Sequence, residues 1–476
     1  MDEAAVHVLV FPWPLQGHIN TFLPLAGALA DSGIHVTFLH TEHNFHRIRC
    51  VASPRLRFLS IPDGLPRDHA RTVGDLMALM DSMGTAGAAS YRALLLSLLS
   101  AAGSRATVDT AGVETEITGG FPPVTCVVAD GIMTFAIDIA EDLGVPALSF
   151  RTASANSFLS YLSVPRLVEL GETPLAVDSP VHGVPGMEGF LRRRDLPRPP
   201  AGVGHQTESE TQEVHPSLLK VARGIAHSGK ARALVLNTAV SLEGSALLHI
   251  APHMRDVFAI GPLHALPAVA AAPTGSLWRE DDGCVAWLDG HAARSVVYVS
   301  LGSLTLISHE EFTEFLFGLI DAGYAFLWVL RPDMVGAAER AVLEEAVKDS
   351  SKVRVVDWAP QRDVLRHPAV GCFLTHCGWN STMEGILEGV PMVCWPFFAD
   401  QLINSRFVHA VWKTGLDMKD RCDRATVRSM VTEVMESTDM RRSVQELGLQ
   451  VRRDIAEGGS SATEFKRLLA FIRDSA

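Results

Sequence analysis

Residues 358–401 read WAPQRDVLRHPAVGCFLTHCGWNSTMEGILEGVPMVCWPFFADQ, and their pattern indicates the fold class. Its apolar run at 371–375 predicts a buried strand, and His376-Cys377-Gly378 predicts a tight turn. A helical pattern opens at Trp379 directly after the turn. Strand, turn and helix in this order form the repeating unit of a parallel sheet that helices cover on both faces.

The same alternation continues on both sides of this stretch. Strand-like runs lie at 296–301, 326–330, 353–356 and 392–395 in the second half and at 6–11, 36–40, 124–129 and 233–237 in the first half, with helical patterns at 19–32 and 133–143. We therefore expect an α/β chain with two facing, doubly wound Rossmann-like domains and a ligand cleft at the carboxyl ends of their strands. The expected boundaries are 1–250 for the first domain, 251–275 for a linker that is rich in Ala and Pro from 261 onward, and 276–455 for the second domain. A helix at about 456–476 is expected to pack back on the first domain.

Composition narrows the class of function. The chain has 476 residues and a net charge of −13, and it contains no long basic block, so nucleic acid is not an expected partner. Its 7 cysteines are scattered along the chain, which fits a reduced cytoplasmic setting. The apolar stretches are too short or too interrupted to span a bilayer, so we expect no membrane insertion, while association with a membrane enzyme stays open. We expect a monomer.

The helix start in the quoted stretch suits a diphosphate, because free backbone N–H groups and the positive end of the helix dipole point out of it. Neighbouring side chains can hydrogen-bond the rest of a nucleotide sugar. They are His376, Asn380 and Ser381 as donors, Glu384 for ribose hydroxyls, and Asp400 and Gln401 for a sugar. Each feature alone is more often plain scaffold, so only the combination points to a site.

His18 follows the first predicted strand in the loop 14–20 and is expected to face the cleft. A position at a helix start favours the uncharged imidazole, which can take a proton from a hydroxyl. Asp130 ends another predicted strand of the same domain and could hold the second ring nitrogen. A histidine or aspartate in such a place is, by itself, more often structural.

Residues 358–401 resemble the signature of the plant secondary product glycosyltransferases, a family of UDP-dependent glycosyltransferases, and match its 44-residue length without a gap. The resemblance implies a GT-B type fold, with the family's catalytic His and Asp at His18 and Asp130. A Gln at the last signature position, here Gln401, implies glucose rather than galactose. The implied donor contacts are Trp358, Ala359 and Gln361 for uracil and ribose, Glu384 for ribose, His376, Asn380, Ser381 and Ser303 for the diphosphate, Thr152 for the sugar or phosphate, and Trp379, Asp400 and Gln401 for the transferred sugar.

The predicted activity is that of an inverting O-glucosyltransferase. It would move glucose from UDP-glucose to a hydroxyl of a small, largely apolar acceptor of phenolic, flavonoid or terpenoid type and give a β-glucoside. UDP-glucose is the donor substrate, and we expect no cofactor and no metal. The sequence offers no Asp-x-Asp motif suited to a cation on the diphosphate, and Cys372, His376 and Cys377 lack a fourth zinc ligand.

Three alternatives stay open: transfer to nitrogen or sulfur, transfer to an existing sugar, and a UDP-sugar-binding protein without catalysis. A dinucleotide oxidoreductase lacks support, because no G-x-G-x-x-G follows the first strand. Thr21 departs from the family, whose members often carry Pro there. Residues 185–187 and 194–197 are expected to form a wall of the acceptor pocket, and the arginines at 192–194 are expected to be solvated.

Overall fold

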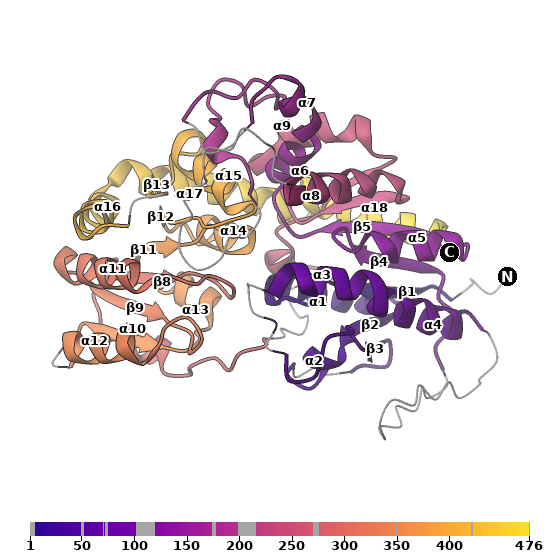
Figure 1. The fold of residues 1–476 in the computed structure, drawn as a ribbon, viewed down its shortest axis with the longest axis horizontal. Helices are drawn as coiled ribbons and strands as arrows, with labels where there is room; N and C mark the ends of the chain where they lie inside the picture. The colour runs from indigo at the N-terminus through magenta and orange to yellow at the C-terminus, as the bar shows by residue number, and fades with distance from the viewer. Residues whose placement is uncertain are drawn as a thin grey trace.

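The computed structural model describes residues 5–48, 52–69, 71, 75–100, 120–173, 178–198, 216–269, 276–348, 350–419 and 422–475. Two lobes lie side by side, with the indigo and magenta N-terminal lobe to the right of the orange C-terminal lobe in Figure 1. Each lobe is built on one sheet, and the named strands of both sheets pair in parallel. This confirms the predicted class of two facing α/β domains.

The N-terminal sheet has seven strands in the order β3-β2-β1-β4-β5-β6-β7. Its strand order reverses between β1 and β4, at the switch point where doubly wound folds bind ligands. The strands are β1 (His7–Phe11), β2 (His35–Thr41), β3 (Leu56–Ile61), β4 (Cys126–Asp130), β5 (Ala147–Arg151), β6 (Ala233–Leu236) and β7 (Val257–Ala259).

The C-terminal sheet has six strands in the order β10-β9-β8-β11-β12-β13, so its switch point lies between β8 and β11. The strands are β8 (Val296–Ser300), β9 (Ala325–Val329), β10 (Val353–Val356), β11 (Val370–Thr375), β12 (Met392–Cys394) and β13 (Gly415–Asp417).

Helices cover both sheets, and every residue of β1, β4, β8 and β11 is buried between them. Burial on both faces explains why these strands are continuous apolar runs. The α-helices of the N-terminal lobe are α1 (Gln16–Asp31), α2 (Glu42–Phe45), α3 (Leu76–Ser82), α4 (Ala88–Leu99), α5 (Thr134–Asp142), α6 (Ala155–Leu162), α7 (Val164–Glu169), α8 (Pro216–Ala226) and α9 (Val240–Ile250). Those that follow are α10 (Cys284–Leu288), α11 (His309–Ala322), α12 (Ala337–Val347), α13 (Gln361–Arg366), α14 (Trp379–Leu387), α15 (Gln401–Arg406), α16 (Arg424–Glu436), α17 (Thr438–Ile455) and α18 (Ser460–Asp474).

The first helix begins earlier than the sequence predicts. α1 starts at Gln16, directly after the extended residue Leu15, whereas the helical pattern predicted a start at 19. The apolar periodicity begins only at Ile19, because the first turn faces the cleft and carries Gln16, Gly17 and His18. His18 therefore lies on a helix, which is a more rigid support than a loop.

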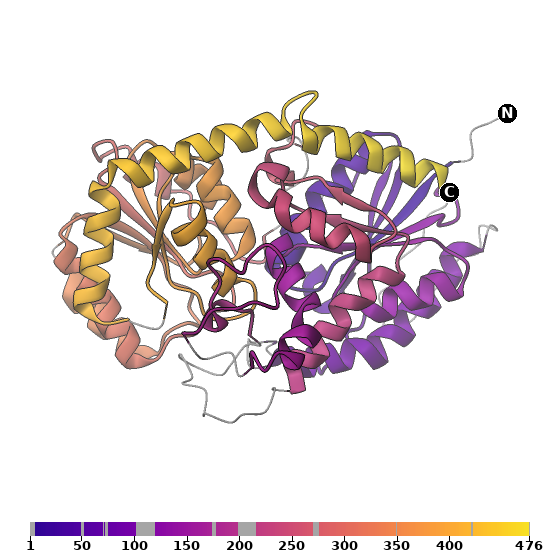
Figure 2. The same ribbon diagram turned by 90° about the horizontal axis from the view of Figure 1, so that it is seen from above.

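The last two helices connect the lobes. In Figure 2, α17 and α18, in yellow, run along one side of the molecule from the C-terminal lobe to the N-terminal lobe. The turn between them needs Gly459, because a Cβ atom there would lie 2.1 Å from the carbonyl oxygen of Arg453. At the far end, Arg473 donates a 2.9 Å hydrogen bond to the carbonyl oxygen of Ser32.

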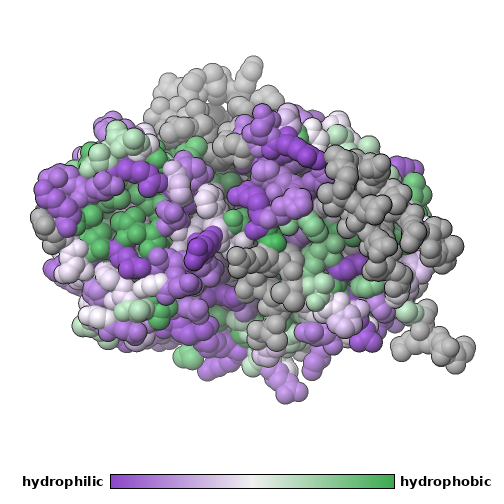
Figure 3. Space-filling model, turned by 90° about the horizontal axis from the view of Figure 1, so that it is seen from below, coloured by the Kyte–Doolittle hydropathy of each residue, from purple (hydrophilic) through white to green (hydrophobic). Residues whose placement is uncertain are grey.

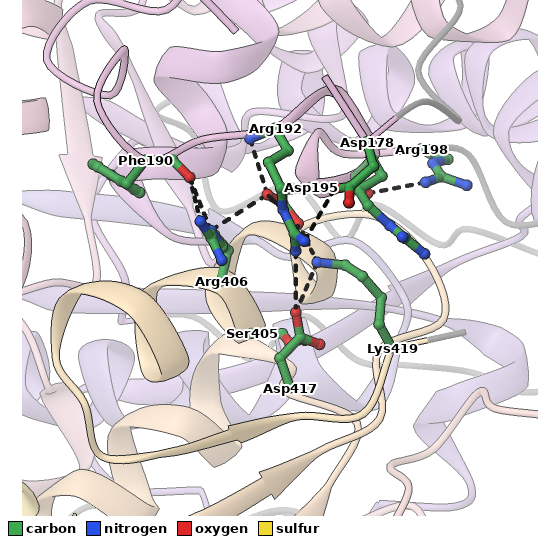
Figure 4. Close-up of polar contacts among 10 residues, drawn as sticks. Asp178, Phe190, Arg192, Asp195, Arg198, Ser405, Arg406, Asp417 and Lys419 are labelled. Atoms are coloured by element: carbon green, nitrogen blue, oxygen red, sulfur yellow. Dashed lines mark hydrogen bonds and ion pairs between the residues drawn. The ribbon is translucent and has the colours of Figure 1, made fainter. Parts of the chain in front are cut away.

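A buried ion network also joins the lobes (Figure 4). Asp195 of the N-terminal lobe is fully buried and accepts a 2.9 Å bond from Nη2 of Arg192. From the C-terminal lobe, Lys419 contacts Asp195 and also lies 2.8 Å from Asp417, and Arg406 lies 3.5 Å from Asp195. Burial would raise the pKa of Asp195, but the two cations Arg192 and Lys419 hold it below its usual value.

Arg192, one of the arginines expected to be solvated, is 27% exposed and also pairs with Asp178 and Asp195. A second expectation for this region was wrong. The segments expected to form a wall of the acceptor pocket, 185–187 and 194–197, do not line the cleft. In the second segment, Asp195 is buried and points toward Lys419 of the other lobe. Arg198, the next residue, does line the cleft.

Among the helices in the part of the chain that the structure describes, none combines the length and the apolar character that a membrane crossing requires. On the face shown in Figure 3, green hydrophobic residues are interspersed among purple hydrophilic ones.

Candidate active site

The two switch points place the predicted catalytic pair and the predicted donor site opposite each other. His18 lies in the first turn of α1 after β1, and Asp130 is the last residue of β4, the neighbouring strand. Nδ1 of His18 lies 2.6 Å from Oδ2 of Asp130. On the other lobe, Ser303 follows β8 and His376 follows β11. Adjacent parallel strands thus bring each pair together at a carboxyl edge.

Asp130 is held firmly in place. The backbone N–H of Trp13 donates to its Oδ2 at 3.3 Å, and that of Ile132 donates to its Oδ1 at 3.1 Å. Burial would raise its pKa, but the charge and hydrogen bond of His18 lower the pKa below its usual value. An ionised Asp130 accepts from Nδ1 of His18, so Nε2 is the ring nitrogen left for a substrate. Oγ1 of Thr152 lies 3.0 Å from the same Nδ1.

A cleft of about 1640 Å³ separates the two carboxyl edges. It is larger than the usual site for one small ligand and has room for a nucleotide sugar and an acceptor together. Asp130 lies behind His18 and is the one predicted site residue that does not line it. The predicted residues that do are His18, Thr152, Ser303, Trp358, Ala359, Gln361, His376, Trp379, Asn380, Ser381, Glu384, Asp400 and Gln401.

Aromatic rings form one end of the cleft. Trp358 stacks on Trp278, with ring centroids 6.0 Å apart and an interplanar angle of 21°. Nearby, Nε2 of Gln361 donates to Oγ of Ser381 at 2.9 Å and to Oε2 of Glu384 at 2.6 Å. Burial raises the pKa of Glu384, although the bond from Gln361 acts in the opposite direction. This end offers a flat apolar surface beside hydrogen-bonding groups.

His376 sits between two glycines. A Cβ atom on Gly302 or on Gly378 would lie 2.5 Å from Nε2 of His376, so any larger residue would displace the ring. Gly302 also has φ +77°, a conformation that favours glycine. Burial lowers the pKa of His376 to about 4, so the ring is uncharged at neutral pH and can donate through one nitrogen. It lies beside the N-terminus of α14.

Two predicted donor contacts point their side chains at the N-terminal lobe. Nε1 of Trp379 donates to the carbonyl oxygen of Asn237 at 2.7 Å, and Nδ2 of Asn380 donates to that of Gly17 at 2.8 Å. Thr21, the departure from the family pattern, donates to Oδ1 of Asn380 at 3.2 Å. Pro could not make this bond. These contacts fix the start of α14 against the helix that carries His18.

Asp400 and Gln401 lie at the opposite end of the predicted donor site. Burial raises the pKa of Asp400, which accepts a 3.1 Å bond from Nδ2 of Asn404. Oε1 of Gln401 accepts from the backbone N–H groups of Phe397 and Phe398 at 2.9 and 3.2 Å. The amide group of Gln401 is thereby oriented with its NH₂ as the free end.

Sequence reasoning missed Trp278, Arg151 and Glu243. Burial raises the pKa of Glu243 to about 7, and its carboxyl accepts from the backbone N–H groups of Ala155 and Asn156 at 2.8 and 2.9 Å. Glu243 therefore fixes the start of α6, next to Thr152. A buried acid in a helical pattern carries no sequence signal, whereas Arg151, a charged residue at the end of a largely apolar strand, is a signal that could have been read.

Within the described residues, no group of three or more His, Cys, Asp or Glu side chains gathers in a way that could hold a metal ion.

The sequence of this chain matches a known protein family. The sequence model described as "UDP-glucoronosyl and UDP-glucosyl transferase" matches residues 238–449. The chain is 42% identical to a myricetin 3-O-rhamnoside 1,2-glucosyltransferase from Crocosmia x crocosmiiflora, over 99% of this chain and 96% of the relative. It is 39% identical to a 7-deoxyloganetic acid glucosyltransferase from Catharanthus roseus, over 98% of each.

Solved structures share the fold. A Phytolacca americana protein complexed with UDP-2fluoro-glucose and pterostilbene superposes with a TM-score of 0.77 at 23% identity, over 98% of this chain and 100% of that one. The O. sativa protein Os79, in a complex that includes a trichothecene, superposes with a TM-score of 0.74 at 25% identity, over 98% and 100%.

Proposed function

The chain belongs to the plant UDP-glycosyltransferases of the UDP-glucuronosyl and UDP-glucosyl transferase family, and we propose that it is an inverting, UDP-glucose-dependent O-glucosyltransferase. Its acceptor is a small, largely apolar molecule with a hydroxyl group, and its product is a β-glucoside. The observation that carries the proposal is the 2.6 Å contact between His18 and Asp130 across the cleft from the start of α14.

The proton and the bonds move as follows in this proposal. Nε2 of His18 takes the proton of the acceptor hydroxyl, and Asp130 stabilises the imidazolium that forms. The acceptor oxygen attacks the anomeric carbon from the face opposite UDP. The bond from that carbon to the diphosphate oxygen breaks, and the configuration inverts.

The donor lies along the C-terminal lobe in this proposal. Uracil stacks on Trp358. Ala359 and Gln361 contact the base or the ribose, and Glu384 accepts from the ribose hydroxyls. The remaining contacts are Ser303, His376, Asn380 and Ser381 for the diphosphate, Thr152 for the sugar or phosphate, and Trp379, Asp400 and Gln401 for the glucose. The backbone N–H groups at the start of α14 offset the charge that develops on UDP.

The acceptor lies in the N-terminal lobe, beside α3 and α8. Apolar residues dominate this part of the cleft, among them Leu76, Met77, Met80, Val221 and Ile225. The two relatives named above act on myricetin 3-O-rhamnoside and on 7-deoxyloganetic acid.

The direct test is incubation with UDP-glucose and a broad acceptor panel, with product mass and anomeric configuration determined by NMR. We expect β-glucosides, with UDP-galactose and UDP-glucuronate used much more slowly because of Gln401. Retention of the α configuration, or turnover with another UDP-sugar only, would overturn the proposal.

Transfer to an existing sugar is the second candidate, because the relative at 42% identity is a 1,2-glucosyltransferase that acts on a rhamnoside. Including flavonoid rhamnosides beside their aglycones in the panel separates the two candidates. Preference for the rhamnoside would favour the second.

A further inference from the structure

Arg151 is a buried cation in the cleft. It is the last residue of β5, it lines the cleft, and only 6% of it is exposed. Its side chain crosses Gly131, where an added Cβ atom would lie 2.5 Å from Cδ of Arg151. A buried guanidinium is strongly disfavoured unless an anion compensates it.

Among the described residues, no carboxylate is in ion-pair contact with this cation. Nε and Nη1 of Arg151 are buried without a hydrogen-bond partner in the described structure. Asp130 is bound by His18 and by backbone N–H groups, and Asp400 is bound by Asn404. Both carboxylates act on Arg151 only through space, so no described carboxylate compensates its charge by direct contact.

The position of Arg151 relates it to the acceptor rather than to the diphosphate. The proposed diphosphate site is at the start of α14 in the other lobe, whereas Arg151 belongs to the N-terminal sheet. Its neighbour in sequence, Thr152, lies 3.0 Å from Nδ1 of His18. An anion bound at Arg151 would therefore lie on the same side of the cleft as His18.

We propose that Arg151 binds a carboxylate of the acceptor, so that the preferred acceptors are hydroxy carboxylic acids, held by the carboxylate and glucosylated on the hydroxyl. A guanidinium that no described carboxylate contacts suits a ligand carboxylate in charge and donor capacity, and charge-assisted bonds of this kind are strong. This inference rests on the proposed function and names the acceptor class for the same site.

The test compares hydroxy acids with their methyl esters, which differ mainly in charge. The probes are 3-hydroxybenzoate, 4-hydroxybenzoate and 4-hydroxycinnamate with UDP-glucose. For at least one pair we expect the wild-type kcat/KM to be at least about 10-fold higher for the acid. Arg151→Met should remove this preference by raising KM for the acid, with the ester changed by less than about 3-fold.

Further variants separate recognition from a structural role. Arg151→Lys keeps the charge and should restore part of the preference. Arg166→Met removes a surface arginine that pairs with Glu169 and should change neither substrate. Equal losses on acid and ester in Arg151→Met, with Arg151→Lys folded, would mean that Arg151 only supports Asp130, and would overturn the inference. A wild-type enzyme that prefers every ester would overturn it even if Arg151→Met fails to fold.

Two readouts keep this inference distinct from the proposed function. If neither acids nor esters are glucosylated, the proposed function fails, and calorimetric binding of the acids to wild type and Arg151→Met still tests the inference. If the hydroxy acids give alkali-labile glucose esters instead of alkali-stable glucosides, the carboxylate lies at His18 rather than at Arg151, and the inference is wrong.

Discussion

Nδ1 of His18 lies 2.6 Å from Oδ2 of Asp130, and the proposed chemistry depends on this contact. Without His18 the acceptor loses its base, so we expect His18→Ala to lower kcat by about 10²- to 10⁴-fold. Asp130→Asn should lower kcat by up to about 10⁴-fold, because the amide no longer fixes the Nδ1–H tautomer. Steady-state kinetics with UDP-glucose measure both effects.

The Kd for UDP provides the internal check on these variants. UDP is proposed to bind the opposite lobe, so calorimetric titration should give an unchanged Kd. His182→Ala, at an exposed histidine beside Glu172, should alter neither kcat nor Kd. Near-wild-type turnover by His18→Ala would show that another group is the base.

The loop after β8 and the start of α14 enclose His376 between Gly302 and Gly378. In Gly302→Ala the new Cβ would lie 2.5 Å from Nε2 of His376 and would push the ring from the donor site. We expect the Kd for UDP to rise about 10-fold, as for the loss of one hydrogen bond. Calorimetric titration with UDP measures this.

A second glycine separates the steric effect from the backbone effect. Gly323 also has φ +77°, but nothing lies within 4 Å of its Cβ position. Gly323→Ala should therefore lower stability by about 1–2 kcal/mol and leave the Kd for UDP unchanged. Equal Kd values for the two variants would remove His376 from the donor site.

The relative position of the two lobes depends in part on the network around Asp195. Asp195→Asn removes one anion from Lys419 and from Arg192, which keep Asp417 and Asp178 as partners, so we expect the free energy of unfolding to fall by about 2–3 kcal/mol. Denaturant unfolding measures it. Asp439→Asn, which breaks an exposed pair with Arg442, should change it by less than about 1 kcal/mol. A small effect at Asp195 would mean that the network adds nothing to stability.

Acid should destabilise the whole molecule below pH 6.5, because the effect of three buried histidines exceeds the opposite effect of Glu243, whose pKa burial raises to about 7. Burial lowers the pKa of His7, His40 and His376 from 6.5 to about 4. Between these values the unfolded chain binds more protons than the folded one, so stability is full above pH 6.5 and falls as the pH approaches 4. Each histidine can contribute up to about 3 kcal/mol. We expect Tm at pH 5 to lie below Tm at pH 7.5 at constant ionic strength; equal values would contradict the burial of uncharged histidines.

The parts of the molecule that local patterns determine were predictable from sequence. Strand β10 was predicted at its observed bounds, and α14 begins at Trp379 as predicted, because a turn or a charge marks each boundary. The meeting of His18 and Asp130 was predictable too, since adjacent parallel strands end at one edge.

Contacts between the lobes were not predictable. Asp195 and Lys419 are 224 residues apart, and neither segment carries a pattern that indicates the other. The same holds for the bonds that turn Trp379 and Asn380 toward Asn237 and Gly17, because they depend on how the lobes meet. Sequence therefore predicted which residues gather at the cleft, but not every direction in which they point.

A crystal structure with the non-transferable donor UDP-2-fluoroglucose would give the sharpest test of the proposed function, because it shows where the sugar lies relative to His18. We expect uracil on Trp358, the diphosphate at the start of α14 and the anomeric carbon facing Nε2 of His18 across a space for the acceptor. A diphosphate bound elsewhere, or a sugar turned away from His18, would contradict it.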